Sequence, residues 1–309
     1  MSLLKFRTKQ TPASASAHAG IEALLKGYSI EVMPRTAAKI EDFREHLPAG
    51  TRVYIAHIDG TEIDDMVATA RTLREQGFEP MPHFPARSIA GTATLADWIA
   101  RYQGEADVRQ GLVLAGGIPT PKGQFHSSME LLETGLFDDA GFTHLHVAGH
   151  PEGNRDIDPK GGDAEVMAAL RWKQDFANRS NAEFAIATQF AFEAAPVVAW
   201  AERLAAAGIT MPVHLGIAGP AKLQTLIKFA IACGVGASLS VLQKRARDVT
   251  KLLLPFEPTE ILTDLAAAKA NGRASNIERI HFFPLGGIKT NAEWATQNGG
   301  DSARPANQA

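Results

Sequence analysis

The sequence predicts a single-domain α/β protein, a (β/α)8 barrel of the TIM type. Eight short apolar runs are spaced along the 309 residues, helical patterns fill most of the gaps between them, and no linker divides the middle of the chain. Barrels of this class often reach such a length as one domain. The alternative is an open doubly wound sheet, but the Gly-rich turn expected after its first strand is absent.

The expected strands are mostly apolar throughout, as is typical of parallel strands covered on both faces. They are 28–33, 52–57, 79–84, 111–117, 143–149, 183–189, 211–216 and 277–285. Residues 1–27 are expected to form a flexible arm with a short helix, residues 28–294 the barrel, and residues 295–309 a disordered polar tail.

Helical periodicity predicts helices at 61–77, 94–103, 127–141, 164–179 and 194–208, and at least two more between 220 and 272. Thr61 is the expected N-cap of the first of these helices. Gly77 and Gly208 are expected to end their helices. The two prolines in 252–258 separate the last helices.

Composition excludes several classes of protein. The net charge is −3, from 31 basic and 34 acidic residues spread along the chain, which argues against a nucleic-acid or polybasic membrane partner. Cys233 is the single cysteine, so no internal disulfide and no multi-cysteine metal site is expected. No apolar run approaches the roughly 20 residues of a spanning helix. The N-terminus lacks the apolar region of a secretory signal, so the cytoplasm is the expected compartment.

Barrel enzymes carry their chemistry at the carboxyl ends of the strands. Glu31 lies in the first strand, where a carboxylate needs either a catalytic use or a partner such as Arg35. His57 and His83 end the second and third strands. They are structural residues, site residues, or ligands of a metal-dependent lyase, although a third ligand is not evident.

The later strand ends offer further candidates. Ala115, Gly116 and Gly117 form either a simple tight turn or a bare edge that a flat ligand or a phosphate could approach. The loop with His150 and Glu152 is polar enough to predict a binding loop. The remaining candidates are Arg171 and Lys173, as phosphate ligands or a solvated helix face, and Gln189, as a hydrogen-bonding partner of a flat heterocycle.

Six short motifs follow Glu31 in one series between about Tyr28 and Gly287. They are P-R-T at 34–36, P-H at 82–83, G-G-x-P at 116–119, H-P-E at 150–152, T-Q-F at 188–190 and G-I-x-x-P at 216–220. Each motif alone is weak, but the ordered series resembles the methylenetetrahydrofolate reductase family, in its short bacterial form without a regulatory domain.

The resemblance implies noncovalent FAD in a barrel that transfers a hydride between a nicotinamide nucleotide and 5,10-methylenetetrahydrofolate, giving 5-methyltetrahydrofolate. It implies a reduced folate as substrate and NAD(P)H as one candidate donor. It also implies a homo-oligomer, because barrels of this family often self-associate.

The family's residue roles carry over by position. Glu31 matches the general acid, and burial is expected to help it keep its proton. Gln189 matches the residue that hydrogen-bonds the pterin. Positions at or beside FAD are matched by His57, His83, Ala115, Gly116, His150, Glu152 and Lys173. Glu165 or Asp163 corresponds to the acidic position that binds ribityl or ribose hydroxyls.

Three positions depart from the family pattern. Gly117 stands where relatives have an aspartate near the flavin and the folate. Leu223 stands where many have an aromatic residue that stacks on nicotinamide or folate, and Gly287 where many bacterial members have an arginine. These departures leave the electron donor and the direction of the reaction open. They also leave open an alternative function, that of a folate-binding methyl-transfer or carrier barrel without flavin chemistry.

Overall fold

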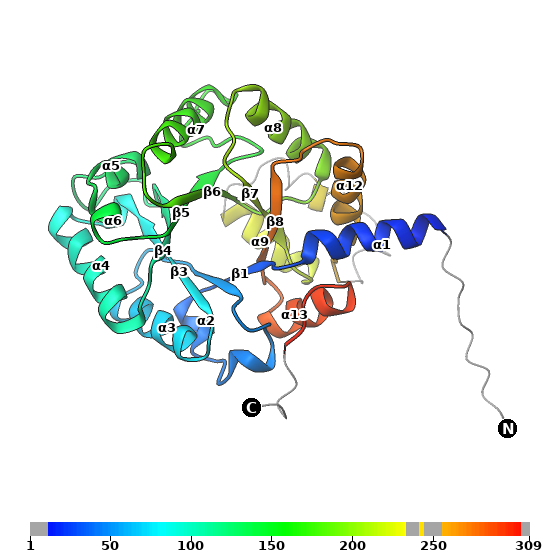
Figure 1. The fold of residues 1–309 in the computed structure, drawn as a ribbon, viewed down its shortest axis with the longest axis horizontal. Helices are drawn as coiled ribbons and strands as arrows, with labels where there is room; N and C mark the ends of the chain where they lie inside the picture. Colours follow the sequence, from blue (N-terminus) through cyan, green and yellow to red (C-terminus); the bar gives the residue numbers. More distant parts are fainter. Residues whose placement is uncertain (1–11, 233–240, 244–254, 304–309) are drawn as a thin grey trace.

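Eight parallel strands form a closed barrel in chain order, ringed by helices (Figure 1). The computed structural model describes residues 12–232, 241–243 and 255–303. The strands are β1 (Ser29–Val32), β2 (Arg52–Ile55), β3 (Glu79–Pro85), β4 (Gln110–Leu114), β5 (His144–Gly149), β6 (Glu183–Thr188), β7 (Val213–Ala218) and β8 (Ile277–Phe283). β8 pairs in parallel with β1, and this closure confirms the predicted TIM barrel.

Every predicted strand is present, with shifts at the ends. β4 stops at Leu114, so 115–117 lie beyond the strand as a connection. β7 begins two residues later than expected, at Val213. Pro212 precedes it and has no N–H to donate to a ladder.

The helices include the predicted ones, with shifted ends, and add two that were not predicted, at 34–37 and 288–297. The helices after β1 are α2 (Pro34–Ala37), α3 (Ile63–Glu75), α4 (Thr92–Ala106), α5 (Ser128–Glu133), α6 (Leu136–Asp139), α7 (Ala164–Ala177), α8 (Ala194–Ala206), α9 (Leu223–Ala232), α12 (Thr259–Ala270) and α13 (Ile288–Gln297), with short 3-10 turns at Phe43–Glu45 and Ala86–Ser88. The expected helix at 127–141 is divided into α5 and α6 at Gly135, whose φ of +74° breaks the helical path.

The predicted helix caps are confirmed at two positions and corrected at one. Gly77 and Gly208 follow the ends of α3 and α8 with positive φ, as expected. The expected cap Thr61 lies one residue too early. Glu62 is the N-cap of α3, and its side chain makes no capping hydrogen bond.

The segment that leads from α1 into β1 lies beside the segment that follows the last helix. Helix α1 (Pro12–Leu25) lies within the predicted arm, but Ile21, Leu24 and Leu25 are buried and α1 packs against α12. α13 continues to Gln297, so the predicted tail starts as helix. Beyond it, Asp301 accepts a hydrogen bond of 2.9 Å from the backbone N–H of Gly27.

The barrel separates an apolar layer from a polar interior. Alternate strand residues such as Ile30 and Val53 pack outward against the helices in the main core. The interior of such barrels is usually filled with branched aliphatic side chains. Here buried polar or aromatic residues occupy much of it, among them Ser29, Tyr54, His146, His214 and His281.

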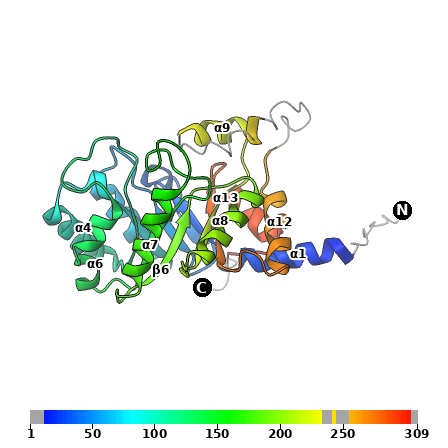
Figure 2. The ribbon, with the colours of Figure 1, turned by 90° about the horizontal axis from the view of Figure 1, so that it is seen from above.

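Helix α9 stands clear of the ring, beyond the end of β7 (Figure 2). It rests on a separate apolar cluster that includes Phe190 and Phe192 after β6, and Phe256. In the part of the chain that the structure describes, no helix has the length and apolar character to cross a membrane. Cys233 lies outside the described residues.

Candidate functional site

Glu31 lies in β1 near the mouth of the barrel, with 17% of its side chain exposed. Its Oε2 is 3.4 Å from Nε2 of His83 on β3 and 3.8 Å from Nε2 of His281 on β8. Arg35, the partner considered from the sequence, is exposed on α2. Two imidazoles from other strands therefore replace it as the neighbours of the carboxylate.

The pKa of Glu31 shifts in the direction opposite to the one expected from the sequence. Burial alone raises a carboxyl pKa, and that was the basis for expecting Glu31 to hold its proton. The interactions with the nearby His281 and His83 imidazoles outweigh burial and lower the pKa of Glu31 to about 2. Glu31 is therefore a carboxylate near neutral pH.

His57 follows β2 and stacks on Trp98, with ring centroids 4.9 Å apart. Its Nδ1 is buried and has no hydrogen-bond partner. Burial, followed by the nearby His83, lowers the pKa of His57 to about 4. Within the described ranges, no group of three or more His, Cys, Asp or Glu side chains is arranged to hold a metal ion. The lyase hypothesis thus finds no third ligand there.

The chain after β4 forms a bare edge. Ala115 accepts a backbone hydrogen bond of 2.9 Å from Arg87. Gly116 has φ of +91°, and a Cβ there would lie 3.0 Å from Cβ of Pro85. Gly117 is exposed, and a Cβ would meet nothing within 4 Å. A large group can therefore approach the backbone at this edge.

A buried cation follows β5 in the chain and lies near His150. Lys173 on α7 is 7% exposed, and burial lowers its pKa to about 8. Burial, with the charge of Lys173 added, also lowers the pKa of His150 to about 4. Among the described residues, no carboxylate forms an ion pair with the Lys173 ammonium. Arg171 is exposed, which agrees with the solvated helix face that the sequence left open for it.

The acidic candidates in this region lie in different environments. Glu152 is half-buried in the loop after β5, whereas Glu165 is exposed in the first turn of α7. Asp163 forms an ion pair of 3.2 Å with Arg203. Of these two alternatives, Asp163 already has a basic partner, and no such partner of Glu165 is found among the described residues. Glu165 is therefore the more available of the two to bind the hydroxyl groups of a ligand.

Gln189 and Leu223 also differ in what they offer a ligand. Gln189 follows β6, and its Oε1 accepts a hydrogen bond of 3.1 Å from the N–H of Phe190, which orients the side-chain amide. Leu223 is only 3% exposed, at the start of α9 within the apolar cluster. Leu223 helps to pack α9 against this cluster, and it presents no open surface on which an aromatic ring of a ligand could stack.

No model of a known protein family matches this chain. The functional proposal therefore depends on the site residues themselves.

The residues at the ends of β2 to β5 fit a large, flat, anionic ligand of the FAD type. They combine the unpartnered Nδ1 of His57, the bare edge at 115–117 and the buried Lys173 ammonium. A buried cation without a counterion is costly, so an anionic group opposite it would stabilise the site. The residues present thus suit the cofactor that the sequence pattern implies.

Sequence reasoning missed two kinds of residue here. His281 was passed over inside an apolar strand, although it contacts Glu31. Asp158 was also missed; its two carboxylate oxygens accept hydrogen bonds of 3.0 and 3.1 Å from the N–H groups of Glu165 and Val166. It thereby satisfies the first turn of α7, the helix that carries Lys173.

One departure from the family pattern has a backbone cause. Gly287 precedes α13 with φ of +105° and ψ of 150°, a conformation that favours glycine. An arginine at this position would be strained.

Proposed function

We propose that this chain is an FAD-dependent oxidoreductase that interconverts 5,10-methylenetetrahydrofolate and 5-methyltetrahydrofolate. The observation that carries the proposal is the position of Glu31, a charged carboxylate between two imidazoles at the barrel mouth. A carboxylate of this kind suits proton transfer at a bound substrate.

Lys173 and His150 are the residues best suited to hold the anionic part of the cofactor. The ammonium is buried and charged below about pH 8, and the neutral imidazole beside it can donate or accept a hydrogen bond. His57 can use its unpartnered Nδ1 in the same way. When bound, FAD supplies the hydride chemistry, and the protein supplies position and electrostatics.

Gln189 suits the pterin ring of the folate. Its Oε1 is engaged by the N–H of Phe190, which leaves the amide NH2 group as a donor for a ligand. A flat heterocycle with acceptor atoms complements this donor. The contact orients the substrate without taking part in bond breaking.

The ionised state of Glu31 suits the proton transfer that the oxidative direction of this reaction requires. When 5-methyltetrahydrofolate loses a hydride from its methyl group, N10 closes the ring on the resulting iminium carbon and loses its proton. Glu31 as a carboxylate accepts that proton. In the reverse direction, Glu31 first takes up a proton and then delivers it to N10 as the ring opens.

The burial of Leu223 favours the second candidate, a folate-binding carrier or methyl-transfer barrel without flavin chemistry. With Leu223 in the apolar cluster, this position offers no stacking ring to a nicotinamide or a folate. A pure carrier has no need of an acid–base residue, so Glu31 favours the oxidoreductase.

The visible spectrum of the purified protein, before and after anaerobic addition of 5-methyltetrahydrofolate, tests the proposal. We expect a flavin spectrum that bleaches on addition. A flavin spectrum that persists would contradict the folate substrate. The absence of flavin after reconstitution with FAD would favour the carrier. A second reduction with NADH or NADPH then tests whether a nicotinamide donor reacts.

A further inference from the structure

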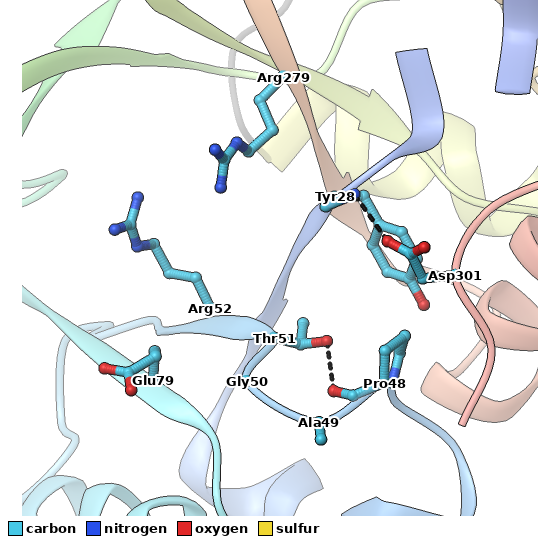
Figure 3. A pocket seen from close by; sticks show the side chains of 10 residues that line it. Tyr28, Pro48, Ala49, Gly50, Thr51, Arg52, Glu79, Arg279 and Asp301 are labelled. Atoms are coloured by element: carbon cyan, nitrogen blue, oxygen red, sulfur yellow. Dashed lines mark hydrogen bonds between the residues drawn. The ribbon is translucent and has the colours of Figure 1, made fainter. Parts of the chain in front are cut away.

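Two arginines share a cavity at the floor of the barrel, the end at which the strands begin. Arg52 is the first residue of β2 and Arg279 lies near the start of β8, and these two strands are the neighbours of β1. Both side chains line a cavity of about 150 Å³. Figure 3 shows their guanidinium groups turned towards the same space, with Asp301 set apart beside Tyr28. The floor therefore brings two cations to one cavity.

Arg52 is held in place without being neutralised. Its Nε donates a hydrogen bond of 2.7 Å to Oε1 of Gln110, and its Nη1 lies 3.4 Å from Nε2 of His146. Both partners are uncharged, since burial lowers the pKa of His146 well below its usual value. Among the described residues, no carboxylate forms an ion pair with Arg52. Burial lowers the pKa of Arg52 as well, and the charge of Arg279 acts in the same direction, but a guanidinium stays protonated.

The carboxylate nearest to Arg52 in the lining is already engaged on both oxygens. Oε1 of Glu79 accepts a hydrogen bond of 3.0 Å from Arg74, and Oε2 accepts one of 2.8 Å from the amide of Gln110. The charge of Glu79 is therefore balanced by Arg74 rather than by Arg52. Through Gln110, Glu79 serves to orient Arg52, because a carboxylate only accepts and thus fixes which way the amide of Gln110 points.

Arg279 has one acidic partner, and that partner lies at the surface. Its Nη2 is 3.5 Å from Oε1 of Glu278, and the two side chains are 35% and 54% exposed. Ion pairs this exposed contribute little. The other donors of Arg279 have no partner in the part of the chain that the structure describes. Asp301, the remaining carboxylate of the lining, accepts instead from the backbone N–H of Gly27 at 2.9 Å.

We propose that Arg52 and Arg279 form a binding site for a small inorganic oxyanion of the phosphate type at the floor of the barrel. A guanidinium presents a planar fork of N–H donors that matches two oxygens of such an anion. An anion between the two groups also offsets the repulsion of two like charges and the cost of burying Arg52.

The size of the cavity suits this class of ligand. A water molecule takes up about 30 Å³ in the liquid, so a cavity of about 150 Å³ has room for the five heavy atoms of phosphate. The site lies at the opposite end of the barrel from Glu31, and the inference is therefore independent of the proposed function. The bound anion would join β2 to β8 on either side of β1, and a ligand that binds only the native state stabilises it.

The test is a calorimetric titration of inorganic phosphate into the purified full-length protein, with sodium chloride holding the ionic strength constant. We expect saturable binding and a melting temperature that rises with the phosphate concentration. Arg52→Gln and Arg279→Gln should each weaken the binding by about 10-fold or more, because charge-assisted hydrogen bonds to the anion are lost. Arg279 is partly exposed, so Arg279→Gln decides the matter if Arg52→Gln fails to fold.

Two control variants locate the anion. Arg109→Gln removes an exposed arginine that precedes β4 at the same end of the barrel and does not line the cavity. Lys173→Met removes the buried cation of the proposed cofactor region. Both controls should retain the phosphate binding that Arg52→Gln and Arg279→Gln lose.

Three outcomes would overturn the inference. They are the absence of phosphate binding by the parent, parent affinity in the folded variants of Arg52 and Arg279, and a loss of binding confined to Lys173→Met, which would place the anion beside Lys173. Neither flavin nor folate enters the readout, so failure of the proposed function would leave these results unchanged.

Discussion

Nε2 of His83 and Oε2 of Glu31 lie 3.4 Å apart, which joins the third strand to the first across the barrel mouth. The contact places the ionisable carboxylate beside the end of the barrel where the bare edge after β4 begins. In the proposed function Glu31 handles the proton, whereas other residues hold the cofactor. A substitution at Glu31 can therefore separate proton transfer from cofactor binding.

Glu31→Gln should keep FAD binding and abolish folate turnover. The amide is nearly the same size but cannot exchange a proton, and residues of the cofactor region such as Lys173 are unchanged. FAD affinity by fluorescence titration and reoxidation of the reduced protein by 5,10-methylenetetrahydrofolate measure the two effects. Turnover at the parent rate would remove Glu31 from the acid–base role.

Lys173→Met should weaken FAD binding by about 10- to 100-fold, because hydrogen bonds to charged groups contribute roughly 1.5–3 kcal/mol. The same change should raise the thermal stability of the FAD-free protein, since it replaces a buried ammonium with an apolar chain. Arg171→Met, at an exposed position of the same helix, is the control. Equal FAD affinities in the two variants would contradict the assignment of Lys173.

Gly117→Asp should fold normally and lower the reduction potential of bound flavin. The position has open space for a side chain, and its φ lies outside the range that favours glycine. A carboxylate near the flavin disfavours the addition of negative charge on reduction. Spectroelectrochemical titration measures the potential, with Gly117→Asn as the uncharged control. Identical potentials in the two variants would place position 117 away from the flavin.

Gln189→Ala should weaken folate binding more than FAD binding, because the amide is proposed to contact only the pterin. Gln189→Glu is the informative companion, since it keeps an acceptor for the N–H of Phe190 and loses the NH2 donor. Both variants should lose folate affinity by about 10-fold or more, on the order of 1.4 kcal/mol or more. Equal losses for the two ligands would indicate a general structural role.

Stability should fall steeply as the pH drops below about 6.5. Burial lowers the pKa of His146, His214 and His281, His214 to about 2, whereas unfolded histidine titrates near 6.5. The unfolded chain then binds more protons, and each such histidine costs up to about 1.4 kcal/mol per pH unit.

Glu31, with its lowered pKa, adds a further loss between about pH 4.5 and 2, because its stabilising charge disappears only as the pH falls through that range. Urea unfolding at several pH values measures the combined dependence. A free energy of unfolding that stays constant from pH 7 to 5 would contradict it.

The fold was predictable from the sequence because each strand is buried on both faces and therefore appears as an apolar run. Helix ends such as Gly77 and Gly208 were visible from local chemistry. The packing of Ile21 to Leu25 was not, since it depends on contacts with distant segments. The division at Gly135 was not predicted either, although its cause is local, the positive φ of that glycine.

Only part of the candidate site could be predicted from the sequence. Glu31 stood out as a carboxylate in an apolar strand, so its burial could be inferred from the sequence. His281 did not, because its inward position follows from the pairing of Ser29 with His281 between β1 and β8. The direction of the pKa shift of Glu31 was consequently misjudged. The burial of Leu223 was not predicted either, because its apolar neighbours come from segments far apart in the sequence.

The pairing of β1 with β8 also has a consequence for biosynthesis. Glu31 leaves the ribosome early, and its partner His281 is made some 250 residues later, as their numbers show. Contacts of such long sequence separation form late and slowly in folding. A nascent chain therefore carries Glu31 without one of its two imidazoles, and the proton-handling site matures only when the last strand closes the ring.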